Sequence, residues 1–412
     1  MNDDVCKGRL RDPARGHGAS PALPAWTAVL SLTMGVFGLL TAEYLPASLL
    51  TPMAASLQVS QAEAGQSITA TAIAALFAGL ALPSLTRGLD RRTVLLAFGV
   101  LMIVSNLLVA LSPNLVMLLA MRVLLGVALG GFWSMAAAVA MRLVPPALVS
   151  RALSIIFSGI AIGTVVSVPL GSYLGGLFGW RSAFLAAAAL GAATFVVQWI
   201  NLPSMPPRNP AGASSSLALL RRRTVGSAML GCVLAHTGQF ILFTYIRPAL
   251  EFVAQVDVQR LSLLLLAFGA ANFLGTLLAG WLMERSLRAT LIVMPAFVGL
   301  AALGLILAPA AGVALLPGIT FWVALWGLAF GGVPVAWSRW VTHALPDHAE
   351  AAGGMVVASV QASIAAGAAL GGWMFNYGGI NTVFINGGLV MLSAAAFIAL
   401  FVCTPKSASR AA

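Results

Sequence analysis

One carboxylate stands inside a long apolar stretch, where acid chemistry is unusual. Glu43 lies within the segment from Trp26 to Leu50, whereas the other acidic residues lie in termini, joints or segment ends. An ionisable group away from water is costly, and it is found mainly where ions or protons move or where it pairs with another charge. Glu43 is therefore the first candidate for a group that takes up and releases a proton.

A basic side chain, Arg122, lies inside another apolar segment at a similar depth. Glu43 lies about seven residues before the end of its segment, and Arg122 lies about seven residues after the start of its own. In antiparallel helices both therefore lie roughly 10 Å from the outer side, at the helical rise of 1.5 Å per residue. A nearby Arg favours the charged form of a carboxylate. We therefore expect Glu43 to carry a coupling proton whose release Arg122 controls; a static ion pair is the alternative.

Two further polar side chains lie within or near the end of one later segment. His236 lies one turn before Gln239, and histidine is the side chain that changes charge near neutral pH. We consider it a second proton site or a hydrogen-bond donor, with a satisfied packing histidine as the alternative. Arg247, near the segment end, is expected either to close an exit by meeting an acid of the first half or to extend its charge toward water.

The composition shows which solvent surrounds these groups. Hydrophobic residues make up 60% of the 412 residues and charged residues 8%, against roughly a quarter charged in soluble proteins. Apolar segments of about 20 residues with short polar joints predict an all-α membrane protein. The formal charge of +11 lies in the joints, which indicates topology rather than nucleic-acid binding. Three scattered cysteines predict no disulfide framework and no metal site.

The chain divides into twelve apolar segments in two halves. The expected helices are 26–50, 63–83, 93–111, 115–140, 152–176, 183–202, 226–249, 261–283, 289–308, 318–338, 352–374 and 382–402. Residues 1–25 are expected to form a disordered arm, 26–202 the first six-helix half, 203–225 a central joint, 226–403 the second half and 404–412 a tail. Basic residues gather in the arm, the central joint and the tail, so these parts are expected in the cytoplasm.

The two halves repeat each other at a constant offset. Gly126, Ala128, Gly130, Gly131 and Pro145 recur 201 positions later as Gly327, Ala329, Gly331, Gly332 and Pro346. Leu170, Gly171, Gly179 and Phe184 recur 200 positions later as Leu370, Gly371, Gly379 and Phe384. Two six-helix halves related by an axis along the membrane normal are typical of secondary transporters, whose substrate site lies between the halves near mid-membrane.

Short motifs in the joints and helices carry a family resemblance. After the eighth segment stand Gly280, Glu284, Arg285 and Arg288, a glycine followed by an acid and two bases. The counterpart after the second segment keeps Arg91 and Arg92, but Pro83 replaces the glycine and Arg87 replaces the acid. Arg122, Gly126 and Gly130 share one helix face, and Gly163, Pro169 and Gly171 follow on the fifth segment. Together these motifs resemble the major facilitator superfamily, in its drug:proton antiporter branch.

That resemblance implies gates at the two cytoplasmic joints and an antiporter motif at Gly163, Pro169 and Gly171. Longer runs resemble the purine ribonucleoside efflux pumps of this branch: Glu43–Met53, Ala64–Ser67, Leu129–Met135, Met141–Pro146, Gly238–Phe240 and Phe243–Pro248. This second likeness implies export of inosine- or guanosine-type nucleosides and their base analogues in exchange for protons. It implies no cofactor, because the proton gradient drives the exchange.

A purine needs flat apolar walls and a few groups that read its edge. Candidate walls are Phe132, Trp133, Trp322, Trp326 and Tyr245, and candidate readers are Gln66, Gln239, Asn272 and Gln361. Most such aromatic residues serve as core or interfacial anchors, so we expect two or three of them to line the cavity.

Other functions compete with this interpretation. An exporter of unrelated drugs uses the same fold, as does an importer; a membrane receptor is expected to carry a large soluble domain. An enzyme is not expected, since the sequence has no phosphate-binding loop, nucleophile elbow or metal-ligand spacing. We expect a monomer in the cell inner membrane whose partners are lipid, protons and a small aromatic substrate.

Overall fold

The computed structural model describes residues 25–207, 223–307, 316–345 and 349–403. Within these ranges nearly all residues are helical, as expected for an all-α membrane protein. Ten of the described helices are long and apolar enough to cross a membrane, judged by length and composition. The expected arm and tail, most of the central joint, and Pro346 lie outside the described residues.

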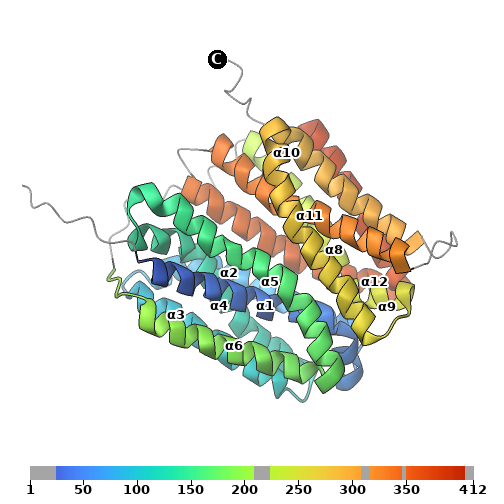
Figure 1. Ribbon diagram of the computed structural model, residues 1–412, viewed down its shortest axis with the longest axis horizontal. Helices are drawn as coiled ribbons and strands as arrows, with labels where there is room; N and C mark the ends of the chain where they lie inside the picture. Colours follow the sequence, from blue (N-terminus) through green and yellow to red (C-terminus); the bar gives the residue numbers. More distant parts are fainter. Residues whose placement is uncertain (1–24, 208–222, 308–315, 346–348, 404–412) are drawn as a thin grey trace, which may run out of the picture.

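Among the described residues, six α-helices come before the central joint and five after it. The first group comprises α1 (Trp26–Leu57), α2 (Gln61–Leu85), α3 (Arg91–Ala110), α4 (Leu115–Leu143), α5 (Val149–Phe178) and α6 (Trp180–Asn201), with a short 3-10 turn η1 (Pro146–Leu148) before α5. The second group comprises α8 (Arg223–Thr244), α9 (Ile246–Ala254), α10 (Val258–Leu307), α11 (Leu316–Ala344) and α12 (Ala349–Phe401). Helices of the first group, blue to green, lie together on one side of Figure 1, and those of the second group lie on the other.

Two helices of the second group are too long for one crossing and contain a break. α10 has 50 residues, which is about 75 Å at 1.5 Å per residue, whereas a bilayer core is about 30 Å thick. Ser286 interrupts α10 with φ −161° and ψ 105°. Gly378 and Gly379 interrupt the 53-residue α12, and Gly379 adopts φ +68°, which favours glycine. Both breaks fall between segments that the sequence predicts as separate helices.

One predicted helix, 226–249, is divided in the structure. α8 ends at Thr244, Tyr245 takes a non-helical conformation, and α9 begins at Ile246. Pro248 explains the division, because it has no N–H to donate to the Thr244 carbonyl and its ring collides with that carbonyl in a continuous helix. The break places Tyr245 and Arg247 at a bend rather than along a straight helix.

Closely approaching backbones hold neighbouring helices together. A Cβ at Gly130 of α4 would lie 2.1 Å from the Ala75 carbonyl oxygen of α2. Gly331, the repeat partner of Gly130, packs in the same manner: a Cβ there would lie 2.0 Å from the Asn272 carbonyl oxygen of α10. Small residues permit such approach in membrane bundles, where no hydrophobic force drives helices together.

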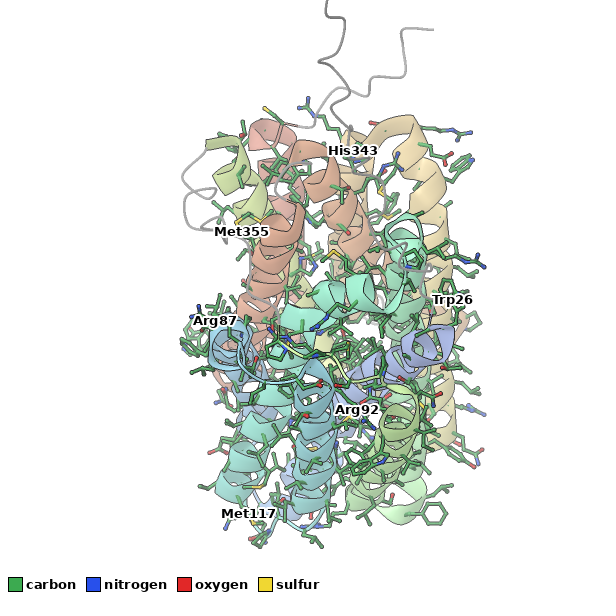
Figure 2. The ribbon with its side chains drawn as sticks, turned by 90° about the vertical axis from the view of Figure 1, so that its left-hand side faces the viewer. Trp26, Arg87, Arg92, Met117, His343 and Met355 are labelled. Atoms are coloured by element: carbon green, nitrogen blue, oxygen red, sulfur yellow. The ribbon has the colours of Figure 1, made fainter. Side chains whose placement is uncertain are left out.

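Contacts between the ends of neighbouring helices define two ends of the molecule, which we call distal and proximal. The distal end contains the end of α1 and the start of α6, where Arg181 donates to Ser56 Oγ and to the Ser112 carbonyl. The proximal end contains the start of α1 and the end of α4, joined by a hydrogen bond from Ala25 N to Leu143 O. Large apolar side chains such as Leu80 and Ile200 are exposed, and carbon-rich side chains project from the outer helix faces in Figure 2, as expected for a surface in contact with lipid.

The chain after α6 is fastened to the proximal end of the first group. Asp90 caps α3 by accepting from Arg92 N, and it also accepts from Ser204 Oγ and Met205 N. Desolvation opposes the charged form, but these hydrogen bonds and the nearby Arg142 together lower the pKa of Asp90 below its usual value. Arg92, labelled in Figure 2, donates to the Trp199 carbonyl of α6.

The close approach of α4 to α2 predicts a stability effect. Gly130→Ala is expected to lower the thermal midpoint in detergent by several degrees, because overpacking a tight contact typically costs about 1–3 kcal/mol. Size-exclusion chromatography of heated, fluorescently tagged protein measures this midpoint. Gly88→Ala is the matched control, since a Cβ at Gly88 meets nothing within 4 Å. Equal midpoints for the two variants would contradict the packing argument.

Candidate functional site

Glu43 of α1 lies in the interior, where its carboxyl meets the side chain of Gln361 from the second group. Its side chain is 3% exposed, and the Oε1 atom has no hydrogen-bond partner. The amide of Gln361, on α12, lies beside the carboxyl and is itself buried with its Oε1 unpaired. The structure therefore brings together two of the predicted residues, one from each group, and leaves an acceptor atom open on each.

Arg122 binds backbone rather than a carboxylate. Its guanidinium donates to the carbonyls of Ala42 at 2.7 Å and Glu43 at 3.1 Å, and its Nε donates to the Ser67 carbonyl at 3.3 Å. Arg122 reaches the residue that it was expected to meet, but the contact is with the main chain of Glu43. In this conformation Arg122 joins α4 to α1 and α2, and its control of a proton on Glu43 stays a prediction.

The other predicted polar residues of α8 lie inside the second group. His236 Nδ1 is 2.8 Å from the Cys232 carbonyl, and its Nε2 is buried without a partner. Gln239 accepts a hydrogen bond of 2.8 Å from Trp326 Nε1. Both contacts are with the second group itself, so the geometry brings neither residue to Glu43.

The predicted aromatic walls fall into two kinds. Trp326 is fully buried and packs edge-on against Phe268 and Phe384, so neighbouring rings cover it. Trp133 is half-buried and packs against Phe132 at 5.9 Å and Phe157 at 5.8 Å between ring centroids. Trp133 thus keeps an accessible surface, whereas Trp326 belongs to the core of the second group.

Two further predicted residues serve helix packing. Asn272 on α10 donates to the Gly327 carbonyl of α11 at 3.3 Å, next to the close α10–α11 approach. Trp322 packs on Gly304, where an added Cβ would lie 2.6 Å from its indole ring. Neither contact involves the first group of helices.

Tyr245 and Gln66 lie in a tight contact between α2 and α12 toward the distal end. A Cβ at Gly65 would lie 2.5 Å from the Tyr245 hydroxyl, and one at Gly372 would lie 3.3 Å from Gln66 Nε2. The Tyr245 ring stacks on Phe375 with 5.5 Å between centroids. These two predicted residues therefore join the two groups.

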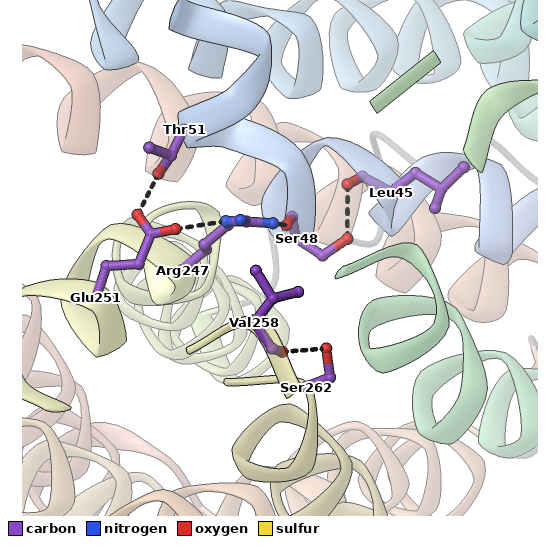
Figure 3. A network of polar contacts seen from close by, with 7 residues as sticks. All are labelled: Leu45, Ser48, Thr51, Arg247, Glu251, Val258 and Ser262. Atoms are coloured by element: carbon purple, nitrogen blue, oxygen red, sulfur yellow. Dashed lines mark hydrogen bonds and ion pairs between the residues drawn. The ribbon is translucent and has the colours of Figure 1, made fainter. Parts of the chain in front are cut away.

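A polar network closes the same end between α1 and α9 (Figure 3). Arg247 forms an ion pair with Glu251 at 2.7 Å, and its guanidinium donates to the Ser48 carbonyl at 2.6 Å. Glu251 also accepts from Thr51 Oγ1 at 2.6 Å. Arg247 thus meets the first group through a carbonyl, and the acid comes from its own helix rather than from the first half as one alternative expected.

Residues of the two predicted gate motifs contact parts of their own group. Arg91 donates to Thr86, and Arg92 to Trp199. Arg285 lies 3.4 Å from the Trp281 ring centroid, and Arg288 donates to the Ala399 carbonyl. Gly280 and Glu284, which complete the motif, lie on the same stretch of α10, and Glu284 is exposed.

The predicted antiporter motif lies on α5 against α1. A Cβ at Gly163 would lie 3.2 Å from Leu40 Cβ, and one at Gly171 would lie 2.6 Å from Leu45 Cδ2. Pro169 lines a cavity of about 510 Å³ between α5 and α10. The small residues of this motif therefore let α5 approach the stretch of α1 that carries Glu43.

Several contacts were not predicted from the sequence. Tyr44, next to Glu43, packs edge-on against Phe243 of α8 at 5.3 Å between centroids and touches the hydrophobic cores of both groups. Thr51 and Glu251 form the distal network described above. The sequence offered a signal for two of them: Tyr44 directly follows Glu43, and Glu251 lies one helical turn after Arg247. Among the described residues no group of three or more His, Cys, Asp or Glu side chains could hold a metal ion.

Comparison with known proteins identifies the class. The model of the Major Facilitator Superfamily matches residues 32–349 and 228–412, so the chain belongs to this superfamily of transporters. The chain is 41% identical over 394 residues to the purine ribonucleoside efflux pump NepI of Salmonella typhimurium, with 94% of this chain and 96% of the relative covered. NepI of Salmonella paratyphi C matches equally well. The chain is thus a transporter rather than an enzyme, as expected.

Solved structures support the fold. A D-xylose–proton symporter aligns with a TM-score of 0.72 and 17% identity, covering 93% of this chain and 98% of the other. An inward-facing, unoccupied bacterial homolog of the human lysosomal transporter Spinster aligns with a TM-score of 0.64 and 16% identity, covering 92% and 95%. At these identities the likeness concerns the fold alone.

The three carbonyl contacts of Arg122 predict a structural cost that charge alone does not explain. Arg122→Met is expected to reduce thermal stability, because the Ala42 carbonyl, four residues before Pro46, loses its donor at a cost of about 1–3 kcal/mol, whereas the Ser67 carbonyl still accepts from Thr71 Oγ1. Arg122→Lys keeps the charge but not the fork of donors, so it should recover only part of the loss. Thermal midpoints in detergent measure both, with the exposed Arg87→Met as control. Full stability in Arg122→Met would contradict the structural role.

Proposed function

We propose that this chain is a proton-driven antiporter that exports purine ribonucleosides such as inosine and guanosine, with their base analogues, from the cell. The observation that carries the proposal is the buried carboxyl of Glu43 beside Gln361, at the boundary between the two groups of helices. The substrate class rests on the 41% identity to efflux pumps of that name, which extends over nearly the whole chain. Export of another aromatic compound by the same site is the alternative.

We further propose twelve spans in two six-helix halves, with both termini and the central joint in the cytoplasm of an inner-membrane protein. The breaks at Ser286 and Gly378–Gly379 support two crossings each for α10 and α12. The matching approaches at Gly130 and Gly331 support the repeat. Under this orientation the distal end faces outward, and its network of Thr51, Glu251 and Arg247 belongs to an outward-closed state.

In the proposed transport cycle, the proton and the substrate bind in turn at Glu43 and do not bind together. A carboxylate that loses its proton at this depth needs a compensating donor, since an unpaired buried charge is costly. Substrate arriving from the inside supplies such donors, and a proton arriving from the outside replaces them. Parting of α1 from α9 opens the outer end, and parting of the proximal ends opens the inner end. His236 is kept in this proposal as a second proton site.

A transport experiment tests the direction and the coupling. Inverted membrane vesicles with an acidic interior are expected to accumulate radiolabelled inosine, whereas vesicles without a pH gradient only equilibrate it. Glu43→Gln should abolish accumulation yet retain exchange of inosine at saturating concentration, since a glutamine side chain can accept a hydrogen bond but cannot carry the proton. Glu63→Gln, an exposed acid in the first turn of α2, is the matched control. Gradient-driven accumulation by Glu43→Gln would remove Glu43 from the coupling mechanism.

The distal network yields a second test of alternating access. Cysteines in place of Thr51 and Glu251, whose side-chain oxygens lie 2.6 Å apart, should be joined by a short thiol crosslinker. Inosine exchange is expected to fall to background on crosslinking and to recover on reduction, because the outer end can no longer open. Each single cysteine variant serves as control, in a background without Cys6 and Cys403. Exchange at the full rate in the crosslinked protein would show that this end does not open.

A further inference from the structure

The Gln361 amide lies within hydrogen-bond reach of the Glu43 carboxyl, and one oxygen of each side chain is left without a partner. Glu43 is 3% exposed and Gln361 is 4% exposed, and the Oε1 atom of each has no hydrogen-bond partner. Leaving buried polar atoms unpaired costs free energy, and two such oxygens side by side on different groups are candidates for contact with a ligand. Both open atoms are oxygens, and a ligand that pairs with both must present two adjacent donors.

The position of the pair fits a transported ligand. Glu43 lies on α1 of the first group and Gln361 on α12 of the second, so a molecule held by both is released when the groups part. Tyr44, half-buried and packed edge-on against Phe243, places an aromatic surface next to the carboxyl. Arg122 holds the backbone of Ala42 and Glu43 in place by direct hydrogen bonds.

Among purine bases, the edge with adjacent donors is that of guanine. Guanine presents N1–H and the N2 amino group side by side, and hypoxanthine, the base of inosine, presents N1–H alone. Adenine has an acceptor at N1, which an ionised carboxylate repels. We infer that Glu43 and Gln361 together recognise the N1–H and 2-amino edge of a 6-oxopurine base, an inference that rests on the proposed function and makes guanosine the preferred nucleoside.

Recognition by an ionised carboxylate couples the substrate to the proton without a separate relay. A protonated Glu43 is a donor and lacks the charge that strengthens a hydrogen bond from N1–H. The charged and titratable groups that face Glu43 are Arg122 from α4 and Tyr44 on α1. Guanosine binding should therefore weaken as the pH falls and Glu43 takes up a proton.

Competition binding to purified protein, with radiolabelled guanosine as the probe, tests the inference. Unlabelled guanosine should compete best and inosine less well, while 1-methylguanosine and adenosine should compete about 10- to 100-fold more weakly, the usual worth of a hydrogen bond to a charged group. Glu43→Gln should reduce the preference of guanosine over adenosine and remove the pH dependence, because a neutral amide offers one donor and one acceptor. Glu63→Gln should behave as wild type.

The outcomes separate this inference from the proposed function. If 1-methylguanosine competes as well as guanosine in a protein that transports guanosine, the donor-edge recognition is wrong and the antiporter proposal stands. If guanosine neither binds nor is accumulated in vesicles while another aromatic compound is, both are wrong. A preference for guanosine that survives in Glu43→Gln and is lost in Gln361→Leu would assign the recognition to Gln361 alone and overturn the role of the carboxylate.

Discussion

The three hydrogen bonds of Arg122 are the interaction on which the interior of the first group depends. A guanidinium cannot lose its charge at physiological pH, and its donors must be satisfied inside the bundle. Here they bind the carbonyls of Ala42, Glu43 and Ser67, so α4 fixes α1 and α2 at one level. One consequence is that the Glu43 carboxyl is left free of the Arg122 donors and can face the second group. A direct ion pair would have occupied the atoms that a proton or a ligand needs.

The two groups meet both by close packing and through hydrogen-bonded side chains; a Cβ at Gly269 of α10, for example, would lie 2.8 Å from Val165 Cα of α5. Within a group, helices approach until backbone atoms nearly touch, as at Gly130, and such contacts do not rearrange easily. Toward the distal end the groups meet through the side chains of Arg247, Glu251 and Thr51. Hydrogen bonds of this type exchange with water at modest net cost. The side-chain hydrogen bonds at the distal end can thus be exchanged when the groups move, as the proposed alternating access requires.

Composition and spacing predicted much of this architecture. Apolar length located the helices, and the joint residues located the breaks at Ser286 and Gly379. The depth of Glu43 and Arg122 followed from counting along a helix. The direction in which each aromatic side chain points could not be predicted. A helix that is apolar on all sides has no periodic pattern that shows which side is covered. Trp133 and Trp326 read alike in the sequence, yet only Trp133 keeps an accessible surface.

The contacts of Arg247 show a second limit, which is geometric. Arg247 was expected to meet either water or an acid of the first half, and its acid partner is Glu251, four residues away on α9. The Arg247–Glu251 pair is itself a local i,i+4 contact, whereas the contacts of these two residues with Ser48 and Thr51 of α1 depend on the bend that Pro248 imposes before α9. A break of one residue thus changes which side chains meet across the boundary. Contacts between α9 and α1 depend on the path of the chain between distant segments. The burial of Glu43 depends only on its position within one apolar helix. For that reason the interior acid was predictable from the sequence, and the contacts across the distal end were not.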